Sequence, residues 1–321
     1  MGDCQYACSA NMDCPSGLHC DQNACRSEGA TGTCDAVRDA AGDDDAGSDG
    51  SDAAAWTRPT FEPPMMVNGL EGSHDCTTVT VMELESELWC TSKAHEIWSA
   101  TRGTGGVWTL PAKLQELNTN STYDTVSPAV SADGTTIYLS SNQDGVSFDI
   151  YRATRGGTAQ TWNPSGVWKH ITTFGDESNE APGTTNGDGS IMIFSAIRPP
   201  AMDADLYEMR GGPQSWGMPA LLVASSSQLR VEQHPSMTAD GLTILFDAAT
   251  FNGGTIEARR LFIAHRPALN RPFESPEEVS ELNNGGMANG GGWLSPDGST
   301  IYFVRELPTQ GPTLFRAHTP P

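Results

Sequence analysis

The stretch Trp293-Leu294-Ser295-Pro296-Asp297-Gly298-Ser299-Thr300-Ile301-Tyr302-Phe303 contains the pattern that decides the fold. An Asp-Gly pair separates an apolar run from a β-branched and aromatic run, which is typical of a tight hairpin between two strands because both turn residues tolerate positive φ. The same pair occurs at residues 133–134, 188–189 and 240–241, each time before a strongly β-prone segment. The chain therefore contains several copies of one β-hairpin.

A third strand follows each hairpin and fixes the length of the repeat. It is apolar and aromatic, as in Asp149-Ile150-Tyr151, and its copies begin at Glu96, Asp149, Asp205, Arg260 and Thr313. The unit thus recurs every 53 to 56 residues, and five copies follow residue 57. The first copy departs from the others because Leu84-Glu85 stands where the Asp-Gly turn belongs.

The fourth strand of each unit shows how the copies are arranged. An aromatic residue followed by aliphatic residues comes after each of the first four units, whereas the fifth such segment, residues 61–67, precedes the first unit. In a ring, this segment can pair with the sheet that ends near Ala317, so that no blade lacks its outer strand. We therefore predict an all-β fold, a five-bladed β-propeller of four-stranded blades that is closed by an N-terminal strand and spans residues 57–321.

Three of these segments resemble a known family of repeats. The Ser295-Pro296-Asp297-Gly298 turn, the Ile301-Tyr302-Phe303 strand and the Asp149-Ile150-Tyr151 strand are similar to the TolB-like β-propeller repeat. The resemblance implies the propeller fold and a role as a binding platform. Propellers of this kind also occur as accessory parts of peptidases and, in related forms, of polysaccharide lyases.

The N-terminal region differs from the repeats in composition. Residues 1–34 contain six cysteines, which predicts a small disulfide-rich module with three disulfides whose pairing the spacing leaves open. A zinc site that includes His19 is the alternative. The segment from Asp13 to Cys20, followed by Cys25, resembles the Dickkopf-like cysteine-rich modules that precede other domains in secreted bacterial proteins.

An acidic segment separates this module from the repeats. Residues 35–53 contain seven aspartates among Ala, Gly and Ser residues, so the segment has little apolar area to bury. We predict a disordered, self-repelling linker over residues 35–56. A calcium-binding tail is the alternative, although calcium prefers a fixed cage of oxygen atoms.

Cysteine usage indicates an oxidising compartment. Cys76 and Cys90 flank the atypical turn of the first copy at nearly opposite positions, and we expect a disulfide there. The chain begins without a charged and apolar leader, so a signal removed upstream, or a lipid anchor before residue 1, is expected. The expected location is extracellular, periplasmic or on the outer-membrane surface.

Charge and hydropathy exclude two classes of protein. The chain has 40 acidic and 18 basic residues and a net charge of −22, which repels nucleic-acid backbones. Its apolar stretches are far shorter than the roughly 20 residues of a transmembrane helix, so we expect no such segment.

The start of each innermost strand supplies a candidate ligand site. Eight or nine residues before each turn, where a propeller lines its channel, the repeats place four acids and one amide: Asp75, Asp124, Glu180, Glu232 and Asn289. His234 lies beside this ring, and Trp293 has no equivalent in the other copies. Crowded carboxylates favour a bound cation such as calcium, or raise one pKa enough for acid–base work. The alternative is that each residue caps the backbone of a neighbouring blade.

The sequence contains none of the motifs that mark a serine nucleophile, a zinc protease or a phosphate-binding loop. We therefore assign no catalytic residue and expect a binding protein whose channel mouth and loops accept a protein or a polysaccharide. A carbohydrate-active lyase or hydrolase that uses the carboxylate ring is one alternative, and a structural envelope component is another.

Overall fold

A computed structural model describes most of the chain after residue 55 and one hairpin before it. The described residues are 18–21, 24–27, 56–67, 69–70, 76–82, 85–118, 122–143, 145, 147–163, 169–171, 178–198, 203–212, 215–222, 229–252, 255–256, 259–283 and 288–321. The chain divides into two compact units, Met1–Ala55 and Trp56–Pro321. None of the described residues belongs to a helix of the length and apolarity needed to cross a membrane.

In the first unit, the described residues form one antiparallel hairpin. It consists of β1 (Leu18–Asp21) and β2 (Ala24–Ser27), which place Cys20 opposite Cys25 in the register. Among the six cysteines of this module, the structure describes only the backbone of Cys20 and Cys25, so the predicted disulfides lie outside the described residues. The predicted linker over residues 35–56 does as well, except for Trp56, which belongs to the second unit. Both remain predictions, as does the resemblance to Dickkopf-like modules.

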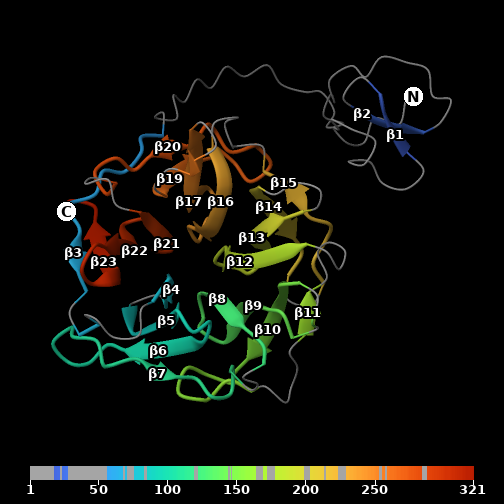
Figure 1. Cartoon of the computed structure of the whole chain (residues 1–321). Helices are drawn as coiled ribbons and strands as arrows, with labels where there is room; N and C mark the ends of the chain where they lie inside the picture. The colour runs from blue at the N-terminus through green and yellow to red at the C-terminus, as the bar shows by residue number, and fades with distance from the viewer. Residues whose placement is uncertain are drawn as a thin grey trace, which may run out of the picture. The chain divides into compact units, whose positions relative to one another are not determined.

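The second unit is a ring of five antiparallel blades, and in the first four of them the strands follow chain order from the centre outward (Figure 1). The described part of this unit contains strands and no helix. Blade 1 consists of β4 (Thr78–Val81), β5 (Glu87–Thr91), β6 (Ile97–Thr101) and β7 (Ala112–Lys113). Blade 2 consists of β8 (Thr125–Val130), β9 (Thr136–Ser141), β10 (Asp149–Thr154) and β11 (Lys169–Ile171). Blade 3 consists of β12 (Asn179–Thr185), β13 (Ile191–Ile197), β14 (Ala204–Arg210) and β15 (Ala220–Leu221).

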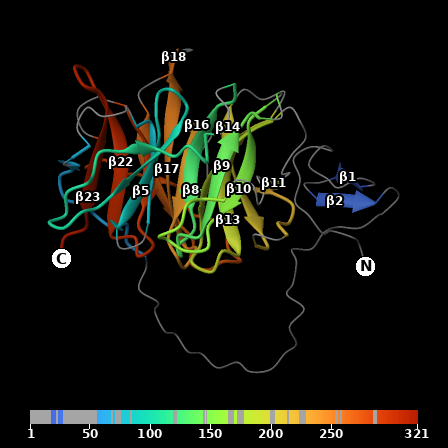
Figure 2. The same ribbon diagram turned by 90° about the horizontal axis from the view of Figure 1, so that it is seen from below.

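The last two blades depart slightly from this plan. Blade 4 consists of β16 (Leu229–Met237), β17 (Thr243–Asn252), β19 (Arg260–His265) and β20 (Glu277–Glu278), with an additional short strand, β18 (Thr255–Ile256), that pairs with the end of β17. Figure 2 shows β18 at the end of β17, on one edge of the ring. Blade 5 consists of β21 (Asn289–Leu294), β22 (Thr300–Leu307), β23 (Gly311–His318) and β3 (Met65–Met66).

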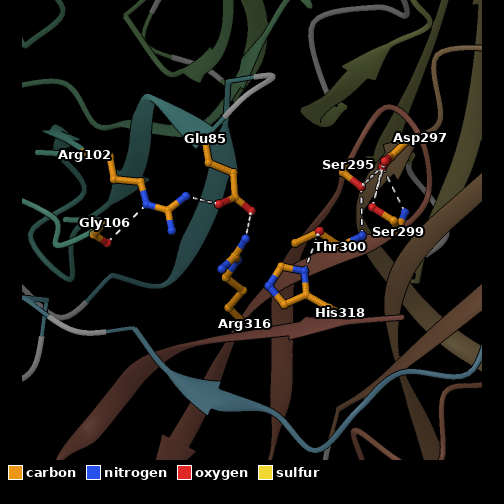
Figure 3. A network of polar contacts seen from close by, with 9 residues as sticks. All are labelled: Glu85, Arg102, Gly106, Ser295, Asp297, Ser299, Thr300, Arg316 and His318. Atoms are coloured by element: carbon orange, nitrogen blue, oxygen red, sulfur yellow. Dashed lines mark hydrogen bonds and ion pairs between the residues drawn. The ribbon is translucent and has the colours of Figure 1, made fainter. Parts of the chain in front are cut away.

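The first and last parts of the propeller meet in blade 5. Met65 and Met66 pair with Arg316 and Phe315 of β23, so the prediction that residues 61–67 close the ring is confirmed. Glu85 of blade 1 strengthens this junction, because its carboxylate is bonded by Arg102 of its own blade and by Arg316 of blade 5 (Figure 3).

The hydrophobic core is divided into five clusters, and each lies between two neighbouring blades. One cluster, for example, joins Val79 and Trp108 of blade 1 to Trp293, Tyr302 and Leu314 of blade 5. The other four clusters join blades 4 and 5, 3 and 4, 2 and 3, and 1 and 2. Burial of apolar area therefore holds the ring together, and alternate residues of each strand face one neighbour or the other.

The Asp-Gly turns differ from the expected two-residue hairpin in one respect. Only the glycine takes positive φ, as at Gly298 (φ 75°), whereas the aspartate does not. Instead, the carboxylate of Asp297 accepts hydrogen bonds from the Ser295 hydroxyl at 2.5 Å and from the Ser299 backbone N–H at 3.0 Å (Figure 3). The aspartate thus stabilises a longer turn through its side chain.

The predicted disulfide between Cys76 and Cys90 is confirmed. It joins the residues just before β4 to β5, and the two Cα atoms are 5.5 Å apart. A disulfide is consistent with an extracellular or periplasmic location, because thiols in the cytosol are kept reduced.

Candidate functional site: the channel mouth at blades 3 and 4

The innermost strands share a bulge that shapes the channel. The register shifts in the middle of β8, β12, β16 and β21, and one extra residue is inserted at each of these points. Ser127, His234 and Gly291 occupy equivalent positions in these bulges and have φ values of 53°, 51° and 59°. Because the backbone turns there, the side chains at each bulge do not follow the simple alternation of a strand.

Side chains on the second strands bind the backbone of these bulges. Thr91 Oγ1 of blade 1 accepts a hydrogen bond of 2.8 Å from the Ser127 N–H of blade 2. Asp247 Oδ1 of blade 4 accepts one of 3.0 Å from the Gly291 N–H of blade 5. The equivalent positions of the five blades are Thr91, Ser140, Ser195, Asp247 and Val304. Blade 4 is therefore distinguished by a carboxylate where three other blades have a hydroxyl.

Asp247 is the centre of a polar network in blade 4. Its side chain has no exposed surface, and its Oδ1 lies 2.7 Å from Nδ1 of His234. Its Oδ2 forms an ion pair with Arg259, whose other terminal nitrogen donates to Oε1 of Gln233 at 2.6 Å. One buried carboxylate thus fixes His234 directly and Gln233 through Arg259.

The pKa of Asp247 is lowered by this network. Burial alone would raise the pKa, and it is the largest single influence, but His234, Arg259 and the Gly291 N–H together outweigh it. Asp247 is therefore ionised at neutral pH, and an ionised carboxylate can only accept hydrogen bonds.

A cavity of about 180 Å³ lies at the mouth of the channel. Glu180, Gln233 and His234 line it, and Phe148 supplies an aromatic ring. Further polar groups in its wall come from Ser127, Ser140, Asn179 and Ser195. The β17–β18 hairpin rises at the same end of blade 4, because Thr250 of β17 pairs with Leu229 at the start of β16.

Glu180 is the carboxylate of this wall among the described residues. Only 2% of its surface is exposed, and its Oε1 accepts a hydrogen bond of 3.1 Å from the Ser178 hydroxyl. Its backbone N–H donates to the Phe148 carbonyl of blade 2 at 2.7 Å. Both neighbours therefore hold Glu180 in place at the boundary between blades 2 and 3.

The channel below the mouth is narrow. Two spaces of about 20 Å³ each follow one another along it, and Trp293 contributes to the walls of both. Only 4% of Trp293 is exposed, and its ring packs edge-on against Tyr302. Each space has about the volume that a single water needs, so the mouth, rather than the depth of the channel, offers room for a ligand.

The structure brings together only part of the predicted ring. Glu180 and His234 line the same cavity, and His234 and Trp293 both line the channel. Asp124 instead lies at the surface with 42% of its side chain exposed, and it pairs with His95 at 3.0 Å. Asp75 lies outside the described residues.

The remaining two ring residues are buried away from the cavity. Asn289 has no exposed surface and accepts a hydrogen bond of 2.8 Å from Arg305 Nε. Glu232 is 2% exposed and does not line the cavity. Three residues of the ring region also join adjacent blades through their backbone, because the N–H groups of Thr125, Glu180 and Asn289 donate to carbonyls of the preceding blade.

No group of three or more His, Cys, Asp or Glu residues in the described part of the chain is arranged to hold a metal ion. Of the carboxylates that were expected to crowd around a cation, Glu180 lines the cavity, whereas Asp124 is partly exposed and pairs with His95. The expected calcium site therefore gains no ligand set from the described residues.

Sequence reasoning missed Asp247, Arg259 and Gln233. Counting back from each turn finds residues at the start of an innermost strand, whereas Asp247 lies on the second strand of its blade. A signal was present, because Asp247 replaces the hydroxyl that Thr91, Ser140 and Ser195 supply at the same position of the repeat.

Comparisons with known proteins identify the fold. No family model and no curated protein matches the sequence. The structure is similar to that of an endo-arabinase from Bacteroides thetaiotaomicron, with 14% identity, a TM-score of 0.52, and coverage of 83% of this chain and 98% of that chain. It is also similar to a glycosyl hydrolase from Bacteroides ovatus, with 11% identity, a TM-score of 0.50, and coverage of 83% and 95%. A putative TolB from Agrobacterium tumefaciens has 16% identity, a TM-score of 0.46, and coverage of 71% and 69%.

Proposed function

We propose that this protein is an exported or surface-held binding protein whose propeller accepts the end of a glycan in the cavity at the channel mouth. The observation that carries the proposal is the wall of this cavity. It combines the carboxylate of Glu180, the side chains of Gln233 and His234, and the ring of Phe148 around about 180 Å³. Ligand sites of this kind combine apolar surface with a few oriented polar groups.

The chemistry of this wall matches a sugar. Sugar hydroxyls both donate and accept hydrogen bonds, so they suit a carboxylate, an amide and an imidazole together. The apolar face of a sugar ring suits an aromatic side chain such as Phe148. At about 180 Å³, the cavity is about nine times as large as each of the two spaces below it, which are of the size that one water needs, so the mouth has room for a sugar unit.

Binding is favoured over catalysis by the state of the carboxylates. Glycoside hydrolysis generally uses two carboxyl groups on opposite sides of the scissile bond. Glu180 supplies one among the described residues of the wall, whereas Asp247 is held by His234, Arg259 and Gly291. A carbohydrate-active lyase or hydrolase that uses the carboxylates of the ring is the alternative, with Glu180 as acid or base.

The test is a thermal melt of the full chain with arabinotriose, cellotriose or chitotriose, and separately with calcium or a chelator. A ligand that binds only the folded state raises the midpoint by mass action. We expect a rise with at least one trisaccharide. The rise should be absent in Glu180→Gln and preserved in Glu278→Gln, which alters an acid on the outer strand β20.

Other outcomes separate the alternatives. The proposal fails if no trisaccharide shifts the midpoint, and a protein partner at the loops then becomes the leading hypothesis. Release of shorter products during prolonged incubation, detected by chromatography and lost in Glu180→Gln, would establish the lyase or hydrolase. A rise with calcium alone would establish a cation site instead.

A further inference from the structure

Two consecutive residues of β16, Gln233 and His234, face the same cavity. Successive side chains of a regular strand point to opposite faces. The bulge at His234, where φ is 51°, removes this alternation and directs both side chains to the ligand side. Blade 4 therefore contributes a pair of neighbouring polar groups to the wall.

The contact with Asp247 determines which nitrogen of His234 carries hydrogen. Asp247 is ionised and can only accept, so the Nδ1 atom 2.7 Å away must be the donor. In the neutral ring, Nε2 then has a lone pair and acts as an acceptor. His234 lines the cavity, and Nε2 is its remaining polar atom.

The contact with Arg259 determines the orientation of Gln233. Arginine has only donors, so the atom of Gln233 that lies 2.6 Å from Arg259 Nη2 must be the carbonyl oxygen Oε1. The amide nitrogen of Gln233 is left to donate. Arg259 is itself fixed by its ion pair with the fully buried Asp247.

We propose that Asp247 and Arg259 are positioning residues that hold His234 as an acceptor and Gln233 as a donor toward the ligand. The inference rests on the proposed function, and it assigns to blade 4 the recognition of ligand hydroxyls. One ligand hydroxyl would donate a hydrogen bond to Nε2 of His234. Another would accept a hydrogen bond from the amide nitrogen of Gln233. Blades 2 and 3 offer small hydroxyls, Ser140 and Ser195, at the position of Asp247, so this arrangement is confined to blade 4.

The first test measures the tautomer of His234 by nitrogen-15 NMR on the full chain, at a pH at which the spectra show the ring to be neutral. His234→Gln identifies the signal. We expect hydrogen on Nδ1 in the wild type. In Asp247→Asn the amide can also donate, and a substantial population with hydrogen on Nε2 should appear. An unchanged tautomer in Asp247→Asn would overturn the proposal.

The second test measures the affinity for the same three trisaccharides by calorimetry. Loss of one oriented hydrogen bond should weaken binding roughly five- to tenfold in Asp247→Asn. Arg259→Gln should weaken binding to a similar degree while leaving the tautomer of His234 unchanged, because Asp247 still accepts from Nδ1. Arg259 is 29% exposed, so this variant also decides the matter if Asp247→Asn does not fold. Unchanged affinity in both variants would overturn the proposal. If Asp247→Asn does not fold, unchanged affinity in Arg259→Gln alone would overturn it.

Glu208→Gln is the matched control. Glu208 is another buried acid paired with an arginine, Arg266, at 2.6 Å, but it does not line the cavity. This variant should lose stability and keep both the tautomer of His234 and the affinity. If the wild type binds none of the trisaccharides, the proposed function fails, while the tautomer in Asp247→Asn still decides whether Asp247 positions His234.

Discussion

Arg266 of blade 4 forms a buried ion pair with Glu208 of blade 3, with 2.6 Å between Nη1 and Oε2. Its Nε atom donates to the carbonyl of Gly241, in the Asp-Gly turn of its own blade, at 2.8 Å. Arg155 of blade 2 repeats both contacts, with Glu87 of blade 1 and with Gly134. The repeat therefore carries a polar connection between blades in addition to the hydrophobic clusters.

Removal of one partner from this ion pair should destabilise the propeller strongly. In Arg266→Met, the buried Glu208 carboxylate keeps only the half-exposed Arg210 of its own strand, at 2.6 Å, and we expect a loss of about 3 kcal/mol in the free energy of unfolding. Urea denaturation of the full chain measures it. Arg260→Met is the control, because Arg260 and Glu278 form a pair at the surface, and it should lose at most about 1 kcal/mol. Equal losses in the two variants would contradict the prediction.

The disulfide between Cys76 and Cys90 should make a measurable contribution to stability. It closes a short loop with a sequence separation of 14, and a loop of this size corresponds to about 3 kcal/mol in the unfolded state. We expect Cys76→Ser with Cys90→Ser to lose about this amount in urea denaturation. A reducing agent should lower the midpoint of the wild type and leave that of the double variant unchanged. If the reducing agent lowered the midpoint of the double variant as well, its effect would come from other cysteines.

Gly291 should tolerate no side chain. Its φ is 59°, and a Cβ atom there would lie 2.3 Å from the Thr77 carbonyl oxygen of blade 1. Gly145 is the control, because its φ is 87° and a Cβ atom there would have no other atom within 4 Å. Gly145→Ala therefore measures the cost of the backbone conformation alone. We expect Gly145→Ala to lose about 1 kcal/mol and Gly291→Ala at least twice as much, as measured by urea denaturation. Similar losses would show that the contact with Thr77 relaxes easily.

Stability should decrease in acid because of the Asp-Gly turns. Burial opposes ionisation of Asp297, but hydrogen bonds from Ser295 and Ser299 outweigh it and lower its pKa below 3.8. The pKa values of Asp133 and Asp188 are lowered by similar bonds. A carboxyl whose pKa is lower in the folded state stabilises fully above about pH 4, and this stabilisation is lost as the pH falls through the folded pKa.

Melting midpoints between pH 6 and pH 2 test this expectation. Asp→Asn replacement at positions 133, 188 and 297 together should flatten the decrease, because an amide keeps the acceptor but does not titrate. Glu278→Gln controls for the loss of one surface charge. A triple variant with the wild-type pH profile would show that other groups, such as the buried Asp247, dominate the acid response.

The fold could be predicted from the sequence because each blade repeats the same local signals. The number of copies predicted the number of blades. The displaced segment at residues 61–67 predicted ring closure, which the pairing of Met66 with Phe315 confirms. The turn conformation was predicted less well. The aspartate side chain, rather than positive φ at both turn residues, stabilises each Asp-Gly turn.

The site was less predictable because it depends on irregularities and on contacts between distant segments. Counting along the repeat selected Glu180 for a ring at the channel, with His234 beside it, and both line the cavity. The register also shifts between Arg230 and Glu232, and Glu232 is buried and does not line the cavity. Asp247 and Arg259 are linked only after β16, β17 and the segment before β19 come together. A spacing rule within one strand cannot detect such a contact.

The pairing of β3 with β23 has a consequence for biosynthesis. Translation begins at the N-terminus, so Met65 and Met66 leave the ribosome long before their partners Phe315 and Arg316 have been made. Four blades contain all of their strands in one continuous segment and can form in order as the chain emerges. The ring itself can close only when β23 has been added, so a nascent chain truncated before β23 has no means of completing it.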